Sequence, residues 1–175
     1  MNPSLVYGFH MLVELLLRLC IHPRIRARML RLLGARIGKN VRIYECRFIN
    51  LKRGFRNLDI GDDVHIGTDC LIDLEGQVRI GPGTTLSPRV TIISHTDPGS
   101  FHSSPWATRF PSEALGVTIG HNCWIGTAAT ILSGSTIGDD IAVGASALVT
   151  GRLRESGVYV GVPARPMKRR PDSAQ

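Results

Sequence analysis

The chain has 175 residues, of which 19 are glycine and only 6% aromatic, and its formal net charge is +7. This length suits one domain with a real core, and a hydrophobic content of 43% argues against a disordered chain and against a fully membrane-embedded one. The charge sits at the ends, because residues 1–36 carry net +5 and residues 165–175 net +3. Without a broad basic face, we expect no nucleic-acid partner.

The first 36 residues (1–36) are predicted to form a helical segment. Residues 4–21 form an apolar stretch that predicts one helix, and His22 with Pro23 ends it because the α conformation is disfavoured before proline. Pro23 can open a second, arginine-rich helix that stops at Gly34.

This N-terminal segment has two interpretations. Its apolar run from Phe9 to Ile21 is too short to span a bilayer, but the helices could lie on an anionic membrane surface with their arginines toward the headgroups. Alternatively, they cap the open end of the domain that follows, as terminal segments of repeat proteins do. We prefer the cap and leave peripheral membrane contact open.

From residue 37 onward, aliphatic residues recur every six positions in five groups of three. A period of six fits neither an α-helix nor a simple alternating strand. It predicts short strands joined by corners, three to a triangular turn, with stacked turns burying the aliphatic residues in columns. The column positions are Ile37, Ile43 and Ile49; Ile60, Ile66 and Ile72; Ile80, Leu86 and Ile92; Ile119, Ile125 and Ile131; and Ile137, Val143 and Val149.

Smaller side chains accompany these columns. Eight of the fifteen column residues are directly followed by glycine, which avoids steric strain in the backbone at corners because it has no Cβ. Four residues after a column position, a small or aliphatic residue is expected to point inward as well. These residues are Val41, Val64, Cys70, Thr84, Val90, Cys123, Ala129, Ser135, Ile141 and Ala147.

These units resemble the hexapeptide-repeat acyltransferase family, which includes the maltose and galactoside O-acetyltransferases. The resemblance covers residues 37–168 and rests on strings such as Ile80-Gly-Pro-Gly-Thr-Thr-Leu86 and Ile119-Gly-His-Asn-Cys-Trp-Ile125. It implies an all-β solenoid, a left-handed parallel β-helix, usually a homotrimer with active sites between subunits. The activity it implies is acetyl transfer from acetyl-CoA to a hydroxyl of a saccharide or a sugar-containing precursor.

The longest interruption of the repeat adds twenty-one residues between Ile92 and Ile119. It predicts a loop at 96–116, and a loop of this length is usually functional. Its mixture of polar and aromatic side chains, Arg109 among them, suits a polar ring-shaped ligand, although it could also be a flap between subunits. Residues 169–175 are expected to form a flexible basic tail.

His95 is the candidate general base. Hydroxyl acylation needs a group that removes the hydroxyl proton, and histidine has a suitable pKa in neutral solution. His95 follows column residue Ile92 at the mouth of the loop, and this segment resembles the catalytic histidine segment of the family. A carboxylate is expected to hold the second ring nitrogen. Asp73 and Asp97 are the candidates.

The resemblance also implies acceptor-binding residues. Asp73 follows a column residue one coil before His95, where relatives place a polar residue that contacts the acceptor, and it could equally be a solvated corner. Trp124 matches a family tryptophan close to the site, where it could stack on a sugar, line the pantetheine path or pack against a neighbouring subunit.

The final coils resemble the coenzyme A section of the family. Residue-by-residue matching implies that Thr127, Ala145 and Thr150 meet the pantetheine arm through backbone groups. Arg165 and Lys168 would approach the phosphates, where charge-assisted hydrogen bonds are strong.

Other activities and the compartment follow from the same residues. The acceptor could instead be serine or a xenobiotic. A γ-carbonic-anhydrase-like metalloenzyme would need three histidine ligands, and His65, His95 and His121 are irregularly set, so no metal is expected. A non-catalytic scaffold is the remaining alternative. Four scattered cysteines favour a reduced, cytoplasmic chain, with peripheral membrane contact as an addition.

Overall fold

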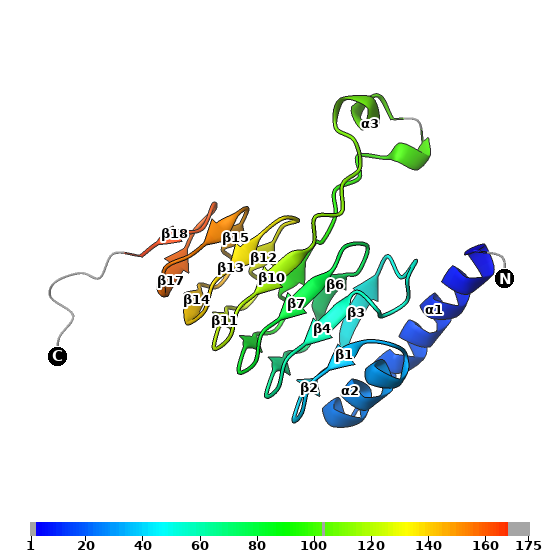
Figure 1. The fold of residues 1–175 in the computed structure, drawn as a ribbon, viewed down its shortest axis with the longest axis horizontal. Helices are drawn as coiled ribbons and strands as arrows, with labels where there is room; N and C mark the ends of the chain where they lie inside the picture. Colours follow the sequence, from blue (N-terminus) through cyan, green and yellow to red (C-terminus); the bar gives the residue numbers. More distant parts are fainter. Residues whose placement is uncertain (1–2, 103, 168–175) are drawn as a thin grey trace, which may run out of the picture.

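The computed structural model describes residues 3–102 and 104–167. It is a left-handed parallel β-helix of about six turns, as predicted. Figure 1 shows the coils stacked side by side, with two helices at the N-terminal end and a loop projecting from one edge. Residues 169–175, predicted to form the basic tail, and Lys168 lie outside the described residues.

The strands form three parallel sheets, one along each side of the triangular coil. Sheet A contains β1 (Arg36–Ile37), β4 (Leu58–Ile60), β7 (Val78–Ile80), β10 (Val117–Ile119), β13 (Thr136–Ile137) and β16 (Arg152–Leu153). Sheet B contains β2 (Arg42–Ile43), β5 (His65–Ile66), β8 (Thr85–Leu86), β11 (Trp124–Ile125), β14 (Ile141–Val143), β17 (Gly157–Val160) and the antiparallel β18 (Arg165–Pro166). Sheet C contains β3 (Cys46–Ile49), β6 (Cys70–Asp73), β9 (Thr91–Ile92), β12 (Thr130–Ile131) and β15 (Leu148–Val149).

The predicted columns run through the interior with one correction. Fourteen of the fifteen column residues are buried, and so are all ten of the smaller inward residues. The prediction for Ile49 is wrong, because Phe48 pairs with Ile72 while Ile49 pairs with Asp73. The first coil reaches the sheet C column five residues after Ile43 instead of six, so Phe48 takes the buried place.

The corners between the sheets carry the backbone strain of the coil. In the described part of the chain, nine residues other than glycine have positive φ, a conformation that asparagine and aspartate tolerate best. Corner side chains also bond from coil to coil. Asn40 Nδ2 donates to Asp63 Oδ1 over 2.7 Å, and Asn122 Nδ2 donates to Asp140 Oδ1 over 3.2 Å.

Two helices precede the solenoid, α1 (Pro3–Arg18) and α2 (Pro23–Leu32). The α2 helix lies against β1 and β2 and buries Ala27 and Leu30 at the open end of the solenoid. The α1 helix lies against β3 and buries Leu17. No helix among the described residues has the length and apolar character needed to cross a membrane.

Two buried polar side chains hold these helices to the first coil. Glu14 of α1 accepts a hydrogen bond from the Phe48 amide through Oε1 (3.2 Å), which satisfies a donor at the open edge of sheet C. Arg26 of α2, 1% exposed, donates to four carbonyl oxygens. They belong to Leu17, Arg18 and Cys20 at the C-terminal end of α1, and to Ile43 of β2.

The long loop leaves the solenoid between β9 and β10 and is closed at its base. Thr96 and Glu113 exchange backbone hydrogen bonds of 2.7 and 3.0 Å. The outer part contains a short 3₁₀ helix, η1 (Ser100–His102), and a one-turn helix, α3 (Pro105–Arg109). Figure 1 shows α3 at the far end of the loop, away from the coils.

Candidate functional site

His95 and Asp73 form a hydrogen-bonded pair at the base of the long loop. The Nδ1 atom of His95 lies 2.6 Å from Oδ2 of Asp73. Asp73 ends β6 and is fully buried, whereas the side chain of His95 is 21% exposed. An ionised carboxylate only accepts hydrogen bonds, so Nδ1 carries the proton and Nε2 is the basic nitrogen. A histidine held in this way can act as a general base.

The Asp73 carboxylate is surrounded by donors. Its Oδ2 also accepts from the Ser94 amide (2.8 Å), the Ser94 hydroxyl (2.9 Å) and the His95 amide (3.1 Å). Its Oδ1 accepts from Asn50 Nδ2 (2.9 Å) and the Glu75 amide (3.1 Å). Burial raises the pKa of Asp73, but the hydrogen bonds from His95, Asn50 and the backbone outweigh it, and the pKa is lowered overall. The carboxylate is therefore ionised at neutral pH.

Ser94 and Asn50 are parts of this arrangement that the sequence did not reveal. Ser94 is buried, its hydroxyl bonds Asp73, and its Oγ accepts from the Gly76 amide (2.8 Å). Ser133 of the next coil donates to the Ser94 carbonyl (2.9 Å). The sequence offered two signals. Ser94 is a small hydroxyl residue directly before the candidate base, and Asn50 directly follows the predicted column residue Ile49, just as Asp73 follows Ile72.

Asp97, the other candidate for orienting His95, does something different. Its Oδ1 accepts from the amides of Gly99 and Ser100 (2.9 and 2.8 Å), and its Oδ2 accepts from the Ser100 hydroxyl (2.8 Å). Hydrogen bonds from the Ser100 amide and hydroxyl are the main reason that the pKa of Asp97 is lowered. Asp97 therefore fixes the turn into η1, and the structure gives the orienting bond to Asp73.

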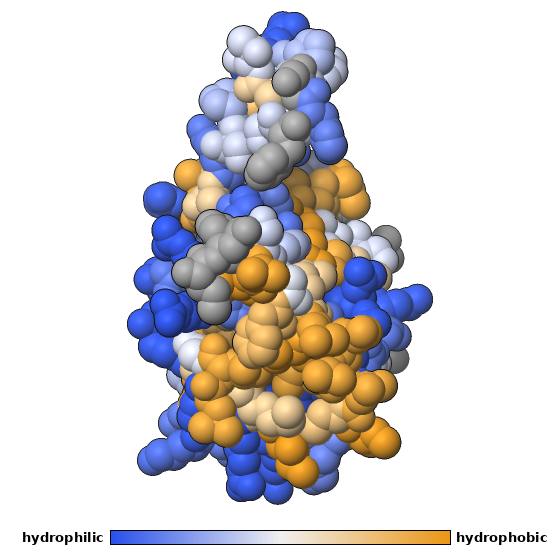
Figure 2. Space-filling view, turned by 90° about the vertical axis from the view of Figure 1, so that its right-hand side faces the viewer, coloured by the Kyte–Doolittle hydropathy of each residue, from blue (hydrophilic) through white to orange (hydrophobic). Residues whose placement is uncertain are grey.

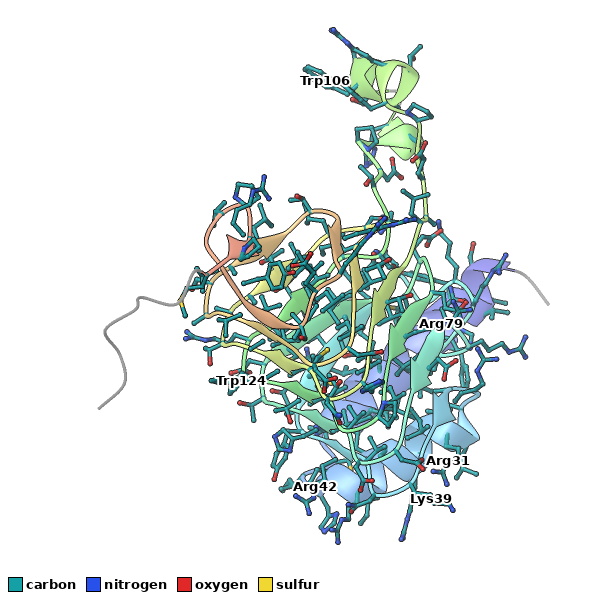
Figure 3. All side chains as sticks on the ribbon, turned by 60° about the vertical axis from the view of Figure 1, so that its left-hand side comes forward. Arg31, Lys39, Arg42, Arg79, Trp106 and Trp124 are labelled. Carbon is teal, nitrogen blue, oxygen red and sulfur yellow. The ribbon has the colours of Figure 1, made fainter. Side chains whose placement is uncertain are left out.

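Arg109 and Trp124 lie away from His95 within one chain. Arg109 belongs to α3 at the tip of the loop, where its guanidinium carbon lies 6.0 Å from the centre of the Phe110 ring. The Phe110 ring in turn stacks on Trp106. Trp124 is 60% exposed on sheet B and donates from Nε1 to Ser87 Oγ (3.0 Å). Figure 3 shows Trp106 at the loop tip and Trp124 on the side of the solenoid.

The residues implied for coenzyme A lie in the last coils but on different edges. Thr127 and Ala145 follow β11 and β14 at the same corner of adjacent coils, and the Thr127 carbonyl accepts from the Ser146 amide (2.9 Å). Thr150 follows β15, on the edge between sheets C and A that also carries His95. Arg165 is exposed on β18 and donates from Nη1 to the Ala164 carbonyl (3.1 Å).

The remaining histidines of the alternative metal reading are spread over the molecule. His65 lies on sheet B against Tyr44, with 5.1 Å between ring centres. His121 lies at a corner between sheets A and B, where its Nε2 is 3.0 Å from Asp139 Oδ2. Within one chain, the described residues contain no cluster of three or more histidine, cysteine or carboxylate side chains placed to hold a metal ion.

Comparison with known proteins gives consistent similarities. WbbJ of Escherichia coli K12, named as a lipopolysaccharide biosynthesis O-acetyl transferase, is 36% identical over 120 residues, which cover 65% of this chain and 58% of that protein. WcaF of the same organism, named as a colanic acid biosynthesis acetyltransferase, is 34% identical over 142 residues, 81% of this chain and 72% of that protein. The chain thus spans between about half and three quarters of the length of these relatives.

A solved structure extends the likeness to nearly the whole chain. The hexapeptide-repeat-containing acetyltransferase VCA0836 from Vibrio cholerae, complexed with acetyl-CoA, matches 94% of this chain and 87% of its own at a TM-score of 0.79. Its sequence identity is 17%, so this likeness concerns the fold. No protein-family model matches the chain.

Proposed function

The chain belongs to the hexapeptide-repeat acetyltransferases, and from that premise we propose that it transfers an acetyl group from acetyl-CoA to a hydroxyl of a saccharide in a cell-surface polysaccharide precursor. The observation that carries the proposal is the hydrogen-bonded pair of His95 and Asp73 at the mouth of the long loop. The names of the two relatives support the acceptor class, because both refer to surface polysaccharide synthesis.

The geometry of the pair supports the proposed mechanism, in which His95 is the general base. Nε2 of His95 accepts the proton of the acceptor hydroxyl while that oxygen attacks the thioester carbonyl. When the tetrahedral intermediate collapses, the C–S bond breaks and the imidazolium returns the proton to the leaving sulfur. Asp73 keeps the proton on Nδ1 and stabilises the imidazolium between these two transfers, as the carboxylate does in a serine-histidine-aspartate triad.

The donor is proposed to approach from the C-terminal coils. Thr150 lies on the same edge as His95, two coils further on, which supports a pantetheine path along that edge. Thr127 and Ala145 offer backbone groups at the neighbouring corner. Arg165 is exposed and bonds only a carbonyl among the described residues, so it can meet a phosphate. Lys168 is proposed to assist it.

Several proposed contacts need a second copy of the chain. Within one subunit, Trp124 lies on sheet B and Arg109 at the loop tip, whereas His95 lies at the corner between sheets C and A. We propose a homotrimer in which such residues complete the acceptor site of a neighbouring subunit, while Asp97 shapes the loop base. The four cysteines are all free thiols, which supports a reducing, cytoplasmic setting.

Thiol release from acetyl-CoA tests this function. The acceptor panel contains mono- and disaccharides, nucleotide-linked and lipid-linked sugars, serine and aminoglycosides. We expect sugar-dependent release that falls on the order of 10²-fold or more in His95→Ala. His121→Ala is the matched control, because His121 also pairs with a carboxylate but at a distant corner. Full activity of a trimeric His95→Ala variant would contradict the proposed base, and release with serine alone would overturn the acceptor class.

A further inference from the structure

The outward face of the N-terminal helices is unusually apolar. Ten large apolar side chains of α1, α2 and the turn between them are 37–92% exposed, and we call them the apolar face. Figure 2 shows hydrophobic residues gathered over this side of the molecule, with hydrophilic residues along its borders. The ten residues are Leu5, Phe9, Leu12, Leu15, Leu16, Leu19, Ile21, Ile25, Met29 and Leu32. A contiguous patch of this kind marks an interaction site.

The α1 helix is apolar on its outward side as well as on the side that buries Leu17 against the solenoid. Glu14 is 5% exposed and turns toward the solenoid, where it bonds the Phe48 amide. Leu12 and Leu16, on the opposite side of the same helix, are 55% and 54% exposed. A helix that only capped the solenoid would bury its leucines and expose its charges. The exposed leucines of α1 therefore indicate a second apolar partner outside the solenoid.

Arginines border the apolar face on α2. A spacing of four and three residues places Arg24, Arg28 and Arg31 on one stripe of the helix. The next stripe, one residue further round, is Ile25, Met29 and Leu32, all exposed. An amphipathic segment with apolar and cationic stripes side by side is typical of helices that lie in a bilayer interface.

The arginine stripe lines a cavity of about 390 Å³ between α2 and the first coil. Arg24, Arg28, Arg31 and Lys39 line it, and none of the residues that line it is acidic. Two of the guanidinium groups are held in place by neutral acceptors. Arg31 donates to the carbonyls of Ile37 (3.0 Å) and Gly38 (2.5 Å), and Arg24 donates to Asn40 Oδ1 (3.3 Å). Positioned cations that pair with no carboxylate in the described part of the chain suit a phosphate group.

We propose that this surface docks the protein on an anionic phospholipid bilayer. The apolar face lies at the acyl boundary, and the arginine stripe with its cavity binds headgroup phosphates. Charge complementarity selects this occupant over a second copy of the chain, because two copies docked through this face would bring two arginine stripes together. Figure 3 shows Arg31, Lys39 and Arg42 together at this end of the molecule, which adds to the positive border.

Vesicle cosedimentation of the full chain tests the proposal without any substrate. The vesicles contain phosphatidylcholine alone or mixed with phosphatidylglycerol, at low and high salt. We expect binding to the anionic vesicles, weakened by salt, and at least tenfold weaker binding in the double variant Leu12→Gln/Leu16→Gln. Arg24→Gln/Arg28→Gln should lose about fivefold per arginine, since one surface cation contributes roughly 1 kcal/mol.

Matched variants separate the surface from general hydrophobicity and charge. Leu115→Gln/Val162→Gln removes two exposed apolar side chains elsewhere, and Arg79→Gln/Arg89→Gln removes two exposed arginines from the third coil. Both controls should bind vesicles as the wild type does. Absence of wild-type binding to anionic vesicles, or equal loss in the controls, overturns the proposal. So does a smaller assembly of Leu12→Gln/Leu16→Gln in sedimentation without lipid, because a second copy would then cover the face.

Discussion

His95 and Asp73 are 22 residues apart in the sequence but meet because their strands are neighbours in sheet C. The pairing of Ile72 with Ile92 sets the register, so that β6 and β9 end at the same corner of adjacent coils. Asp73 closes its strand inside that corner, and His95 follows two residues beyond Ile93. The coil pitch therefore delivers the carboxylate to the imidazole, and Ser94 between them ties the backbone to the same oxygen.

Asp73→Asn should lower kcat on the order of 10²-fold or more with little change in either KM. The amide can no longer accept every hydrogen bond that Oδ2 receives, so the proton is no longer held on Nδ1 of His95. Steady-state kinetics of thiol release measure this. Asp139→Asn at the His121 corner is the control and should retain its rate. A rise in the acceptor KM with an unchanged kcat would show that Asp73 contacts the acceptor instead.

Acid should destabilise the protein through Asp73. Its folded pKa is lowered, so the stabilisation is complete above its unfolded pKa of about 3.9 and is lost as the pH falls through that value toward the folded pKa. Urea unfolding of the wild type and Asp73→Asn between neutral and acidic pH measures the difference. We expect the wild type's advantage in free energy of unfolding to shrink below about pH 4. An advantage that is constant with pH would contradict the assignment.

Arg165→Ala should raise the KM for acetyl-CoA by roughly tenfold to a hundredfold, since a hydrogen bond to a charged group contributes about 1.5–3 kcal/mol, and kcat should change less. Kinetics at varied donor concentration measure this. Arg154→Ala removes another exposed arginine of the last coils and is the control. An unchanged donor KM in Arg165→Ala would leave this guanidinium as surface charge.

Arg26→Met should lower the free energy of unfolding by about 2–3 kcal/mol, because buried carbonyl oxygens lose a charged donor. These are the carbonyls at the end of α1 and that of Ile43. Thermal and urea unfolding measure the loss. Arg28→Met changes an exposed arginine of the same helix, and its effect should stay within about 0.5 kcal/mol. Equal effects of both variants would mean that Arg26 does not join the helices.

One thiol should react far faster than the other three in the native protein. Burial raises the pKa of Cys70 to about 11, and burial likewise raises the pKa of Cys46 and Cys123. These thiols stay protonated near pH 8 and are also shielded. Cys20 is only partly buried. Iodoacetamide labelling followed by peptide mapping should find Cys20 modified first, and rapid labelling of Cys70 would show that the second coil opens.

The six-residue period predicted the fold because each column position tests the same steric requirement. The same period failed at Ile49, where the chain between sheets B and C is one residue shorter. Ile49 is itself aliphatic, so nothing in the pattern marked the shift. The rule that found fourteen column positions cannot detect a connection that is one residue shorter when two hydrophobic residues, here Phe48 and Ile49, are adjacent.

Only the parts of the candidate site that are visible within one segment of the sequence could be predicted. His95 and Asp73 were predicted from their places after column residues together with the family resemblance of their segments. Their contact results from the register of β6 and β9. Asn50 donates to Asp73 from the first coil, and the Ser94 hydroxyl donates to the same carboxylate. Neither residue type is informative alone, since serine and asparagine are common at corners. Likewise, an apolar helix was expected at residues 4–21, but the inward turn of Glu14 depends on the Phe48 amide.

The closed base of the long loop makes the structure of the loop independent of the stacking of the coils. Thr96 bonds Glu113, the Gly116 amide donates to the Ser94 carbonyl over 2.9 Å, and Val117 then pairs with Val78 as though no residues intervened. The residues between these points form a projection whose length does not affect how the coils stack. Such a segment tolerates insertions and deletions without disturbing the strands on either side of it. Under the proposed function, the part of the loop that meets the acceptor can therefore change in length and sequence while the stacked core and His95 stay in place.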